Sequence, residues 1–207
     1  MTNEKFIGWL GSDANAALRR PIAKDPASMI QKPAIFLDRD NTLIHDDGYV
    51  FEIKKFAWIN GATAALKRFH EANIPVFIVT NQSGIGRGVF SEDQMHHFNS
   101  HLISAASKAG GCITDIAFCP HHPLSPNPEM AIACGCRKPE PGLLFNLARR
   151  WNINLSRSVM IGDRDSDVEA GHRAGAHGYL FRQNNLDDLA KQVICTHFSP
   201  NIGSANA

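Results

Sequence analysis

The sequence lacks an apolar run long enough to span a membrane. A span needs about 18 consecutive apolar residues, and no segment approaches that length although 43% of the 207 residues are apolar. Long runs of like charge are also missing, and the formal net charge is only +1. This balance argues against a surface patch for nucleic acid or membrane lipid. We expect a small-molecule partner, no nucleic-acid or membrane partner, and a monomeric chain.

A secretory signal pattern is missing as well. The first twenty residues show no basic start followed by an apolar stretch and a small-residue cleavage site, so we expect a cytoplasmic protein. The five cysteines are too few and too clustered for a disulfide scaffold. Cys119, Cys134 and Cys136 crowd into one segment, while Cys112 and Cys195 stand apart. This clustering indicates metal binding.

The chain length suits one catalytic domain. Residues 1–32 are polar, contain the breakers Pro21 and Pro26, and show no sustained apolar periodicity, so we predict a flexible N-terminal extension. We assign residues 33–195 to the catalytic domain and 196–207 to a C-terminal tail. No insertion is large enough to form a separate cap domain.

Short apolar runs alternate with amphipathic segments after the extension. The runs suit buried parallel strands and cover residues 34–37, 75–80, 113–118, 158–162 and 177–181. Helical patterns lie near residues 61–72, 91–108, 140–151, 165–175 and 186–194. Ser91 and Gln94 form a capping-box pattern, and Pro141 fits the first turn of a helix. The alternation predicts a doubly wound α/β fold with a parallel sheet, whose ligands bind beyond the carboxyl ends of the strands.

Acidic residues follow two of these predicted strands. Asp38 and Asp40 come directly after the first strand, and like charges this close repel unless a divalent cation or a proton neutralises them. An ordinary aspartate turn is the alternative. Asp163 comes directly after the fourth strand and can join Asp38 in an oxygen-ligated Mg²⁺ site. Asp165 more simply caps the helix that begins there.

Hydroxyl and amide groups follow the second predicted strand. These residues are Thr80, Asn81, Gln82 and Ser83. They lead into a glycine-rich turn at residues 84–88, where donor groups can hold phosphate oxygens, although a plain flexible loop is the alternative. The turn matches neither the dinucleotide fingerprint nor a phosphate loop with its lysine, which excludes a nucleotide-binding assignment on this basis. Arg137 and Lys138 precede a helix, where they either neutralise phosphoryl oxygens or form a solvated pair.

A proline-rich segment at residues 119–136 has a pair of potential metal ligands at each end, and one residue separates the two members of each pair. Its candidate ligands are Cys119, His121, Cys134 and Cys136. Three thiolates and one imidazole form a closed tetrahedral Zn²⁺ site of the structural kind, and the ion would order a loop that buries little apolar surface. Reduced cysteines beside a chance histidine are one alternative, and His122 in place of His121 is another.

Together, these motifs resemble the four signatures of the haloacid dehalogenase-like (HAD-like) phosphatases. The resemblance covers about residues 33–185, and its motifs are Asp38-Arg39-Asp40-Asn41-Thr42, Thr80-Asn81, Lys138-Pro139, and Gly162-Asp163 with Asp167. One departure is Asn41, where the family usually has glycine. The position can demand left-handed backbone, which asparagine tolerates best after glycine.

The resemblance implies a HAD-like Rossmannoid fold and a covalent mechanism. Asp38 would attack phosphorus to form an aspartyl-phosphate, and Asp40 would protonate the leaving alkoxide and then activate water. Thr80 and Lys138 would hold the phosphoryl oxygens. Mg²⁺ would be bound by Asp38, by Asp163 and by the backbone carbonyl of Asp40.

The zinc loop resembles one capless subfamily, which acts on heptose bisphosphates or on histidinol phosphate. The segments Asp46 to Val50 and Thr80 to Gly84 resemble its members that act on heptose bisphosphates. The resemblance implies removal of the 7-phosphate of a heptose 1,7-bisphosphate, with Arg137 reading the distal phosphate. The implied substrate contacts are Asp46, Asp47, Gly48, Tyr49, Thr80, Asn81, Gln82, Ser83, Arg137, Lys138 and Arg164. Histidinol phosphate is the alternative substrate, and a zinc-stapled binding module without catalysis is the alternative from another class.

Overall fold

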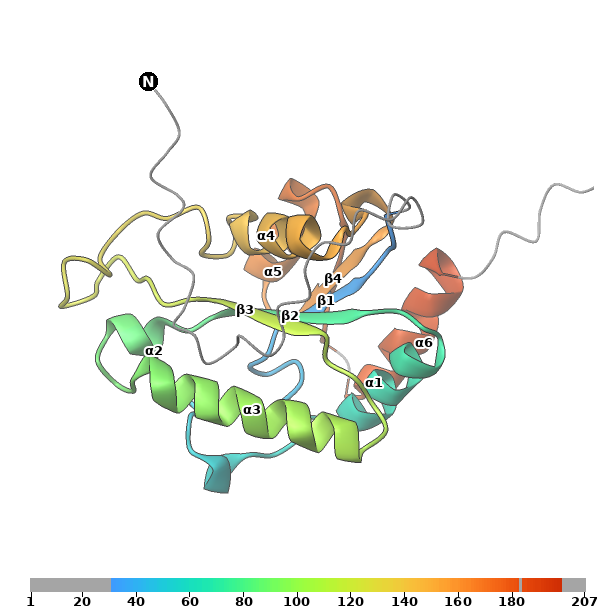
Figure 1. Cartoon of the computed structure of the whole chain (residues 1–207), viewed down its shortest axis with the longest axis horizontal. Coiled ribbons are helices and arrows are strands. Elements are labelled where there is room, and N and C mark those ends of the chain that lie inside the picture. Colours follow the sequence, from blue (N-terminus) through green and yellow to red (C-terminus); the bar gives the residue numbers. More distant parts are fainter. Residues whose placement is uncertain (1–30, 183, 199–207) are drawn as a thin grey trace, which may run out of the picture. The chain divides into compact units, whose positions relative to one another are not determined.

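A five-stranded parallel sheet forms the centre of the structure, a computed structural model that describes residues 31–182 and 184–198 (Figure 1). The strand order is β3-β2-β1-β4-β5. The strands are β1 (Ile35–Leu37), β2 (Val76–Asn81), β3 (Asp115–Cys119), β4 (Val159–Gly162) and β5 (His177–Leu180). Nearly all of the predicted N-terminal extension and residues 199–207 of the predicted tail lie outside the described residues.

The helices agree with the sequence pattern to within a few residues. They are α1 (Ala62–Glu71), α3 (Glu92–Lys108), α4 (Gly142–Trp151), α5 (Asp165–Arg173) and α6 (Leu186–His197). Shorter pieces were not predicted, namely α2 (Ser83–Gly86) and the 3-10 turns η4 (Ile53–Lys55) and η5 (Leu155–Arg157). The capping box of Ser91 and Gln94 is confirmed at the start of α3.

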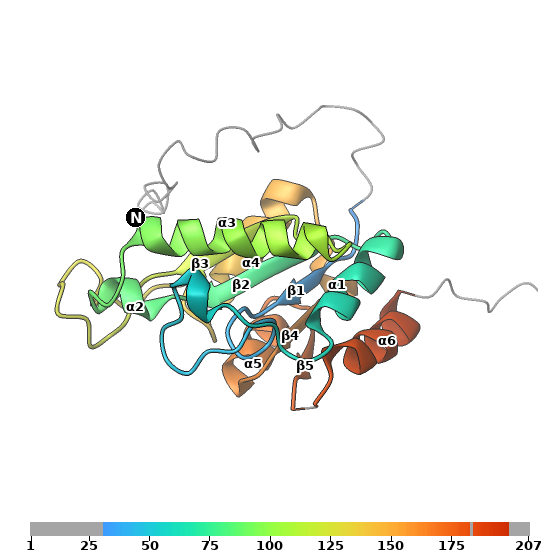
Figure 2. The same cartoon turned by 90° about the horizontal axis from the view of Figure 1, so that it is seen from below.

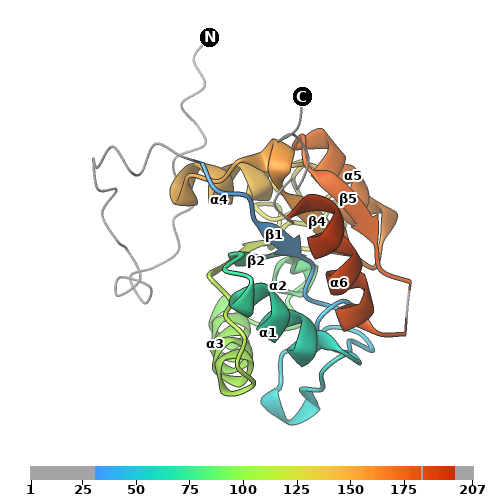
Figure 3. The same ribbon diagram turned by 90° about the vertical axis from the view of Figure 1, so that its right-hand side faces the viewer.

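Two apolar layers cover the sheet, because successive strand residues point to opposite faces. Ile35 and Leu37 of β1 pack in the layer that contains α1, α3 and α6, whereas Phe36 packs in the layer that contains α4 and α5. Figures 2 and 3 show α1 and α6 side by side, on the face of the sheet opposite to α4. The predicted doubly wound α/β fold is confirmed.

The chain reverses its direction of winding at β1, which pairs in parallel with both β2 and β4. From β1 the sheet grows to β2 and β3 on one side, and to β4 and β5 on the other. The carboxyl ends of β1 and β4 therefore flank a topological switch point, the usual ligand site of such sheets. In the described part, the connection from β1 to α1 carries only η4, as expected without a cap domain.

Two expectations about helix starts need correction. Asp165 is the first residue of α5 and not its cap, because Arg164 is the N-cap residue. The Arg164 backbone N–H donates instead to the Asp167 carboxylate, at 3.0 Å. Pro141 is the N-cap residue of α4, one position before the first turn. None of the helices in the described ranges has the length and apolarity that crossing a bilayer requires.

Candidate active site

Three carboxylates meet at the switch point. Asp38 follows β1, Asp163 follows β4, and Asp167 lies in the first turn of α5. Their carboxylate oxygens lie within 4.8 Å of one another. Gly162 makes this approach possible, because a Cβ atom there would collide with the Asp167 carboxylate. The sheet thus brings together the predicted Asp38 and Asp163, and it adds Asp167 as a third member.

Lys138 reaches this cluster from the segment before α4. Its Nζ lies 2.5 Å from Asp38 Oδ1, 2.6 Å from Asp167 Oδ1 and 2.6 Å from the Val79 carbonyl oxygen. The Asn81 side chain holds the Lys138 backbone, accepting from its N–H at 3.0 Å and donating to its carbonyl at 3.1 Å. Lys138 is 4% exposed, so its charge is committed to the site.

One lysine does not balance three carboxylates in a buried site. Burial raises the pKa of Asp38 to about 7; Lys138 opposes this rise, and repulsion from Asp167 and Asp40 adds to it. Burial, followed by repulsion from Asp167, also raises the pKa of Asp163. The site therefore favours an additional cation.

The donor set fits a hard divalent ion. Asp163 Oδ1 is one of two buried side-chain polar atoms that lack a hydrogen-bond partner in the described residues. Such an orphaned oxygen, beside two other carboxylates, is the kind of ligand that Mg²⁺ takes together with water and phosphate oxygens. Asp38, Asp163 and Asp167 are therefore able to hold Mg²⁺ here, directly or through water.

Asp40 lies beside this cluster in its own hydrogen-bond network. The Arg39 guanidinium donates two hydrogen bonds to the Asp40 carboxylate, from Nε to Oδ1 at 2.8 Å and from Nη2 to Oδ2 at 3.2 Å. The Gln82 amide donates to Asp40 Oδ2 at 2.7 Å and to Thr80 Oγ1 at 2.8 Å. Gln82 is buried, so both groups of its amide serve this network rather than solvent.

The segment at residues 46–49 is joined to Asn41, the residue that follows Asp40. Asn41 has φ 58°, which confirms the left-handed geometry expected there. Its amide exchanges two bonds with the Asp46 backbone, at 3.0 and 3.1 Å. Asp46 Oδ1 accepts from the N–H groups of Gly48 and Val50. Asp47, Gly48 and Tyr49 are exposed, so they are accessible to a ligand, whereas Asp46 shapes the turn.

Four predicted zinc ligands converge. The Sγ atoms of Cys119, Cys134 and Cys136 are 3.2 to 3.5 Å apart. His121 Nδ1 lies 3.5 Å from the Cys119 sulfur and 3.3 Å from the Cys136 sulfur. The sulfurs are too far apart for a disulfide, which needs about 2.05 Å, and the compact S₃N set fits a tetrahedral zinc site. His122 instead lies 2.8 Å from the Arg87 guanidinium.

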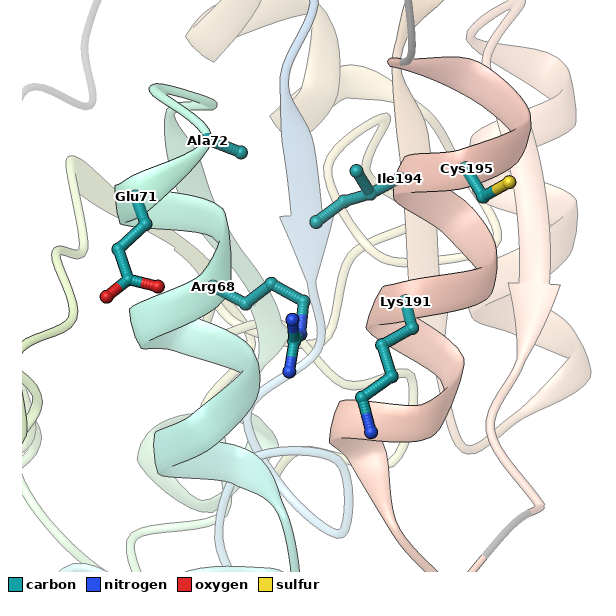
Figure 4. Close-up of a pocket in the computed structure, with 6 residues that line it drawn as sticks. All are labelled: Arg68, Glu71, Ala72, Lys191, Ile194 and Cys195. Carbon is teal, nitrogen blue, oxygen red and sulfur yellow. The ribbon is translucent and has the colours of Figure 1, made fainter.

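The remaining predicted contacts are Arg137, Arg164 and Ser83. Arg137 donates to the His121 carbonyl at 3.0 Å, which joins it to the cysteine cluster. Arg164 is 74% exposed and lies 3.8 Å from Asp163. Ser83 begins α2. A separate pocket between α1 and α6, lined among others by Arg68 and Lys191, contains none of the predicted site residues (Figure 4).

Sequence reasoning missed two participants. The motif alone does not single out Arg39, because arginine is usually exposed and no local pattern signals its burial. Asn99, in the middle of α3, accepts from Arg39 Nη1 at 3.0 Å across 60 positions of sequence. The only available signal for Arg39 was its place between two acidic residues at a strand end.

Comparisons with known proteins indicate the family of the chain. Residues 135–201 match a family described as HAD-hydrolase-like. The chain is 40% identical to the D-glycero-beta-D-manno-heptose-1,7-bisphosphate 7-phosphatase of Rhodopseudomonas palustris, over 81% of this chain and 93% of that protein. It is 35% identical to the corresponding alpha-anomer enzyme of Photorhabdus laumondii, over 68% of this chain and 76% of that protein.

A solved structure gives a similar result. It is the D,D-heptose 1,7-bisphosphate phosphatase of B. bronchiseptica in complex with magnesium and phosphate, with 28% identity and a TM-score of 0.66. The match covers 82% of this chain and 89% of that one. With 40% identity across nearly the whole length of the first relative, the chain belongs to the HAD-like phosphatase family that contains these heptose bisphosphate 7-phosphatases.

Proposed function

We propose that this chain is a Mg²⁺-dependent phosphomonoesterase that removes the 7-phosphate of D-glycero-D-manno-heptose 1,7-bisphosphate. The observation that carries the proposal is the buried cluster of Asp38, Lys138 and Asp167 at the switch point, in a chain similar to enzymes of that name. The beta anomer is the expected substrate, because the relative named for it is the more similar of the two described.

The first half of the reaction transfers the phosphoryl group to the protein. An Asp38 carboxylate oxygen attacks phosphorus, and the bond from phosphorus to the sugar oxygen breaks. Asp40 gives its proton to the leaving alkoxide, which is too basic to depart easily as an anion. The products are the sugar alcohol and an aspartyl-phosphate on Asp38.

The second half returns Asp38 to its free form. Asp40, now a carboxylate, takes a proton from water, whose oxygen attacks the aspartyl-phosphate and releases inorganic phosphate. Lys138 and Thr80 hold the phosphoryl oxygens through both halves. Asp38, Asp163 and the Asp40 carbonyl would hold Mg²⁺, which would supply neutralising charge. Asp167 supports this site through Lys138.

The proposed contacts outside the carboxylate cluster would select the substrate. Arg137 would read the distal phosphate, and its bond to the His121 carbonyl ties its position to the cysteine cluster. We propose Zn²⁺ on Cys119, His121, Cys134 and Cys136 as the ion that orders this loop. Asp46 to Tyr49, Thr80 to Ser83, and Arg164 complete the proposed contacts.

A cytoplasmic location forms part of the proposal. The proposed zinc site needs three reduced thiols, Cys119, Cys134 and Cys136, which suits a reducing compartment. The expectation of a monomer stays a prediction that sedimentation can check.

The test is a phosphate-release panel with Mg²⁺ and with EDTA. It contains both heptose 1,7-bisphosphate anomers, histidinol phosphate and several hexose bisphosphates. The proposal predicts the highest kcat/KM for the beta heptose bisphosphate, with loss of activity in EDTA and recovery with added Mg²⁺. A preference for histidinol phosphate would contradict the substrate, and release from no ester would favour a binding module without catalysis.

A further inference from the structure

Arg39 is the largest of the fully buried side chains in the described residues, with 1% exposure. Burying an arginine is costly unless its donors are paired. All three guanidinium nitrogens have acceptors, which are the Asp40 carboxylate, the Gln82 and Asn99 side-chain oxygens, and the Val50 carbonyl. A guanidinium that donates from all three of its nitrogens is held in one orientation, so it can impose that orientation on its partners.

We propose that Arg39 is a positioning residue that holds Asp40 in the orientation needed for proton transfer. This inference rests on the proposed function, in which Asp40 is the acid and then the base. The Arg39 fork contacts both oxygens of the Asp40 carboxylate, and Gln82 adds a third donor on Oδ2. These three bonds fix the plane of the carboxylate, which a single bond would leave free to rotate.

Arg39 is in turn held by helix α3. Asn99 accepts from Nη1 at 3.0 Å, and the Phe98 ring lies 5.1 Å from the guanidinium carbon. The Asn99 amide donates onward to the Met95 sulfur at 2.8 Å. Helix α3 thus supports Asp40 indirectly, through its contacts with Arg39.

The contacts argue for positioning rather than for fold stability. A buried ion pair is often no more stabilising than apolar side chains of similar volume. The Arg39–Asp40 pair itself joins sequence neighbours, whereas the bonds to Gln82 and Asn99 connect Arg39 to the end of β2 and to α3 and hold the guanidinium in place. The guanidinium is therefore best explained by the geometry that it imposes on the carboxylate.

The test compares two esters in Arg39→Lys, which keeps the charge and loses the fork. With heptose bisphosphate, whose alkoxide must be protonated, we expect kcat to fall about 10²-fold and KM to change less than about threefold. With p-nitrophenyl phosphate, whose leaving group needs no proton, we expect the first-turnover burst of nitrophenolate to fall by less than about threefold. A merely structural defect would lower both reactions together.

The matched control is Arg68→Lys. Arg68 forks onto Asp187 with the same two-bond pattern, at 2.7 and 3.0 Å, between α1 and α6. We expect this variant to keep wild-type rates on both esters. Asn99→Leu is the second variant, which keeps Arg39 but frees one guanidinium nitrogen, and we expect the same ester selectivity with a smaller loss of about tenfold.

Three results would overturn the inference. The first is a wild-type rate of phosphate release from heptose bisphosphate in Arg39→Lys. The second is an equal loss of rate on the two esters in both Arg39→Lys and Asn99→Leu. If the wild-type chain is active, either result overturns this inference and leaves the proposed function standing. A wild-type chain inactive on both esters would overturn the proposed function and this inference with it. Circular dichroism of each variant separates unfolding from a specific defect.

Discussion

At the scale of single residues, the site depends on charges that are buried yet paired. Lys138 bridges the carboxylates of Asp38 and Asp167 through one ammonium group. Removing Lys138 would leave two buried carboxylates without a cation, and removing either aspartate would leave the lysine with one anionic partner instead of two, which is costly in a buried site. The arrangement therefore needs each of its members, and substitutions in it should affect activity far more than substitutions of exposed aspartates.

Asp38→Asn removes the proposed nucleophile while keeping its shape. We expect phosphate release to fall at least about 10³-fold, because an amide cannot form the aspartyl-phosphate. Rates of phosphate release and acid-quench trapping of phosphorylated protein measure the effect. Asp188→Asn, at a 61% exposed side chain on α6, is the control and should keep full activity. A fully active Asp38→Asn variant would disprove the covalent mechanism.

Gly162→Ala tests the close approach at the end of β4. The added methyl would meet the Asp167 carboxylate, so we expect Asp167 to move away from Lys138 and kcat to fall about 10²-fold. Gly135→Ala is the control, because its Cβ would meet no atom within 4 Å. Steady-state kinetics of both variants decide the matter, and normal kcat in Gly162→Ala would refute this account of the packing.

At the scale of elements, the sequence predicted more of the strands than of the contacts between them. Short apolar runs followed by acidic or polar residues identify β1, β2 and β4 together with their functional ends, because both signals are local. The Asn81 clamp on Lys138 joins residues 57 positions apart, and Arg39 meets Asn99 across 60. Such pairings depend on how the helices pack on the sheet, which periodicity alone does not specify.

The zinc loop is an element whose order we ascribe to metal rather than to burial. Cys136→Ser should lower bound zinc well below one ion per chain and reduce the thermal midpoint by about 5 °C, roughly 2 kcal/mol for a domain of this size. Elemental analysis and thermal unfolding measure these quantities. Cys112→Ser is the control, because Cys112 is exposed and outside the cluster. Unchanged zinc content in Cys136→Ser would refute the proposed site.

At the scale of the whole domain, apolar layers cover both faces of the sheet, and the charged residues of the site lie at the carboxyl ends of the strands. Asp38, Thr80, Cys119 and Asp163 lie at or directly after the ends of four strands, so one sheet edge carries the proposed catalytic residues and the first cysteine of the proposed zinc site. Composition and motif order predicted this arrangement. The choice of substrate is harder to predict from sequence, because exposed residues such as Tyr49 and Arg164 follow no periodic pattern.

The most direct test of the central claim is ³¹P NMR of D-glycero-beta-D-manno-heptose 1,7-bisphosphate incubated with the protein and Mg²⁺. The account predicts that the resonance of the 7-phosphate disappears, that inorganic phosphate appears in equal amount, and that the 1-phosphate resonance persists. Loss of the 1-phosphate first, or persistence of both resonances, would contradict it.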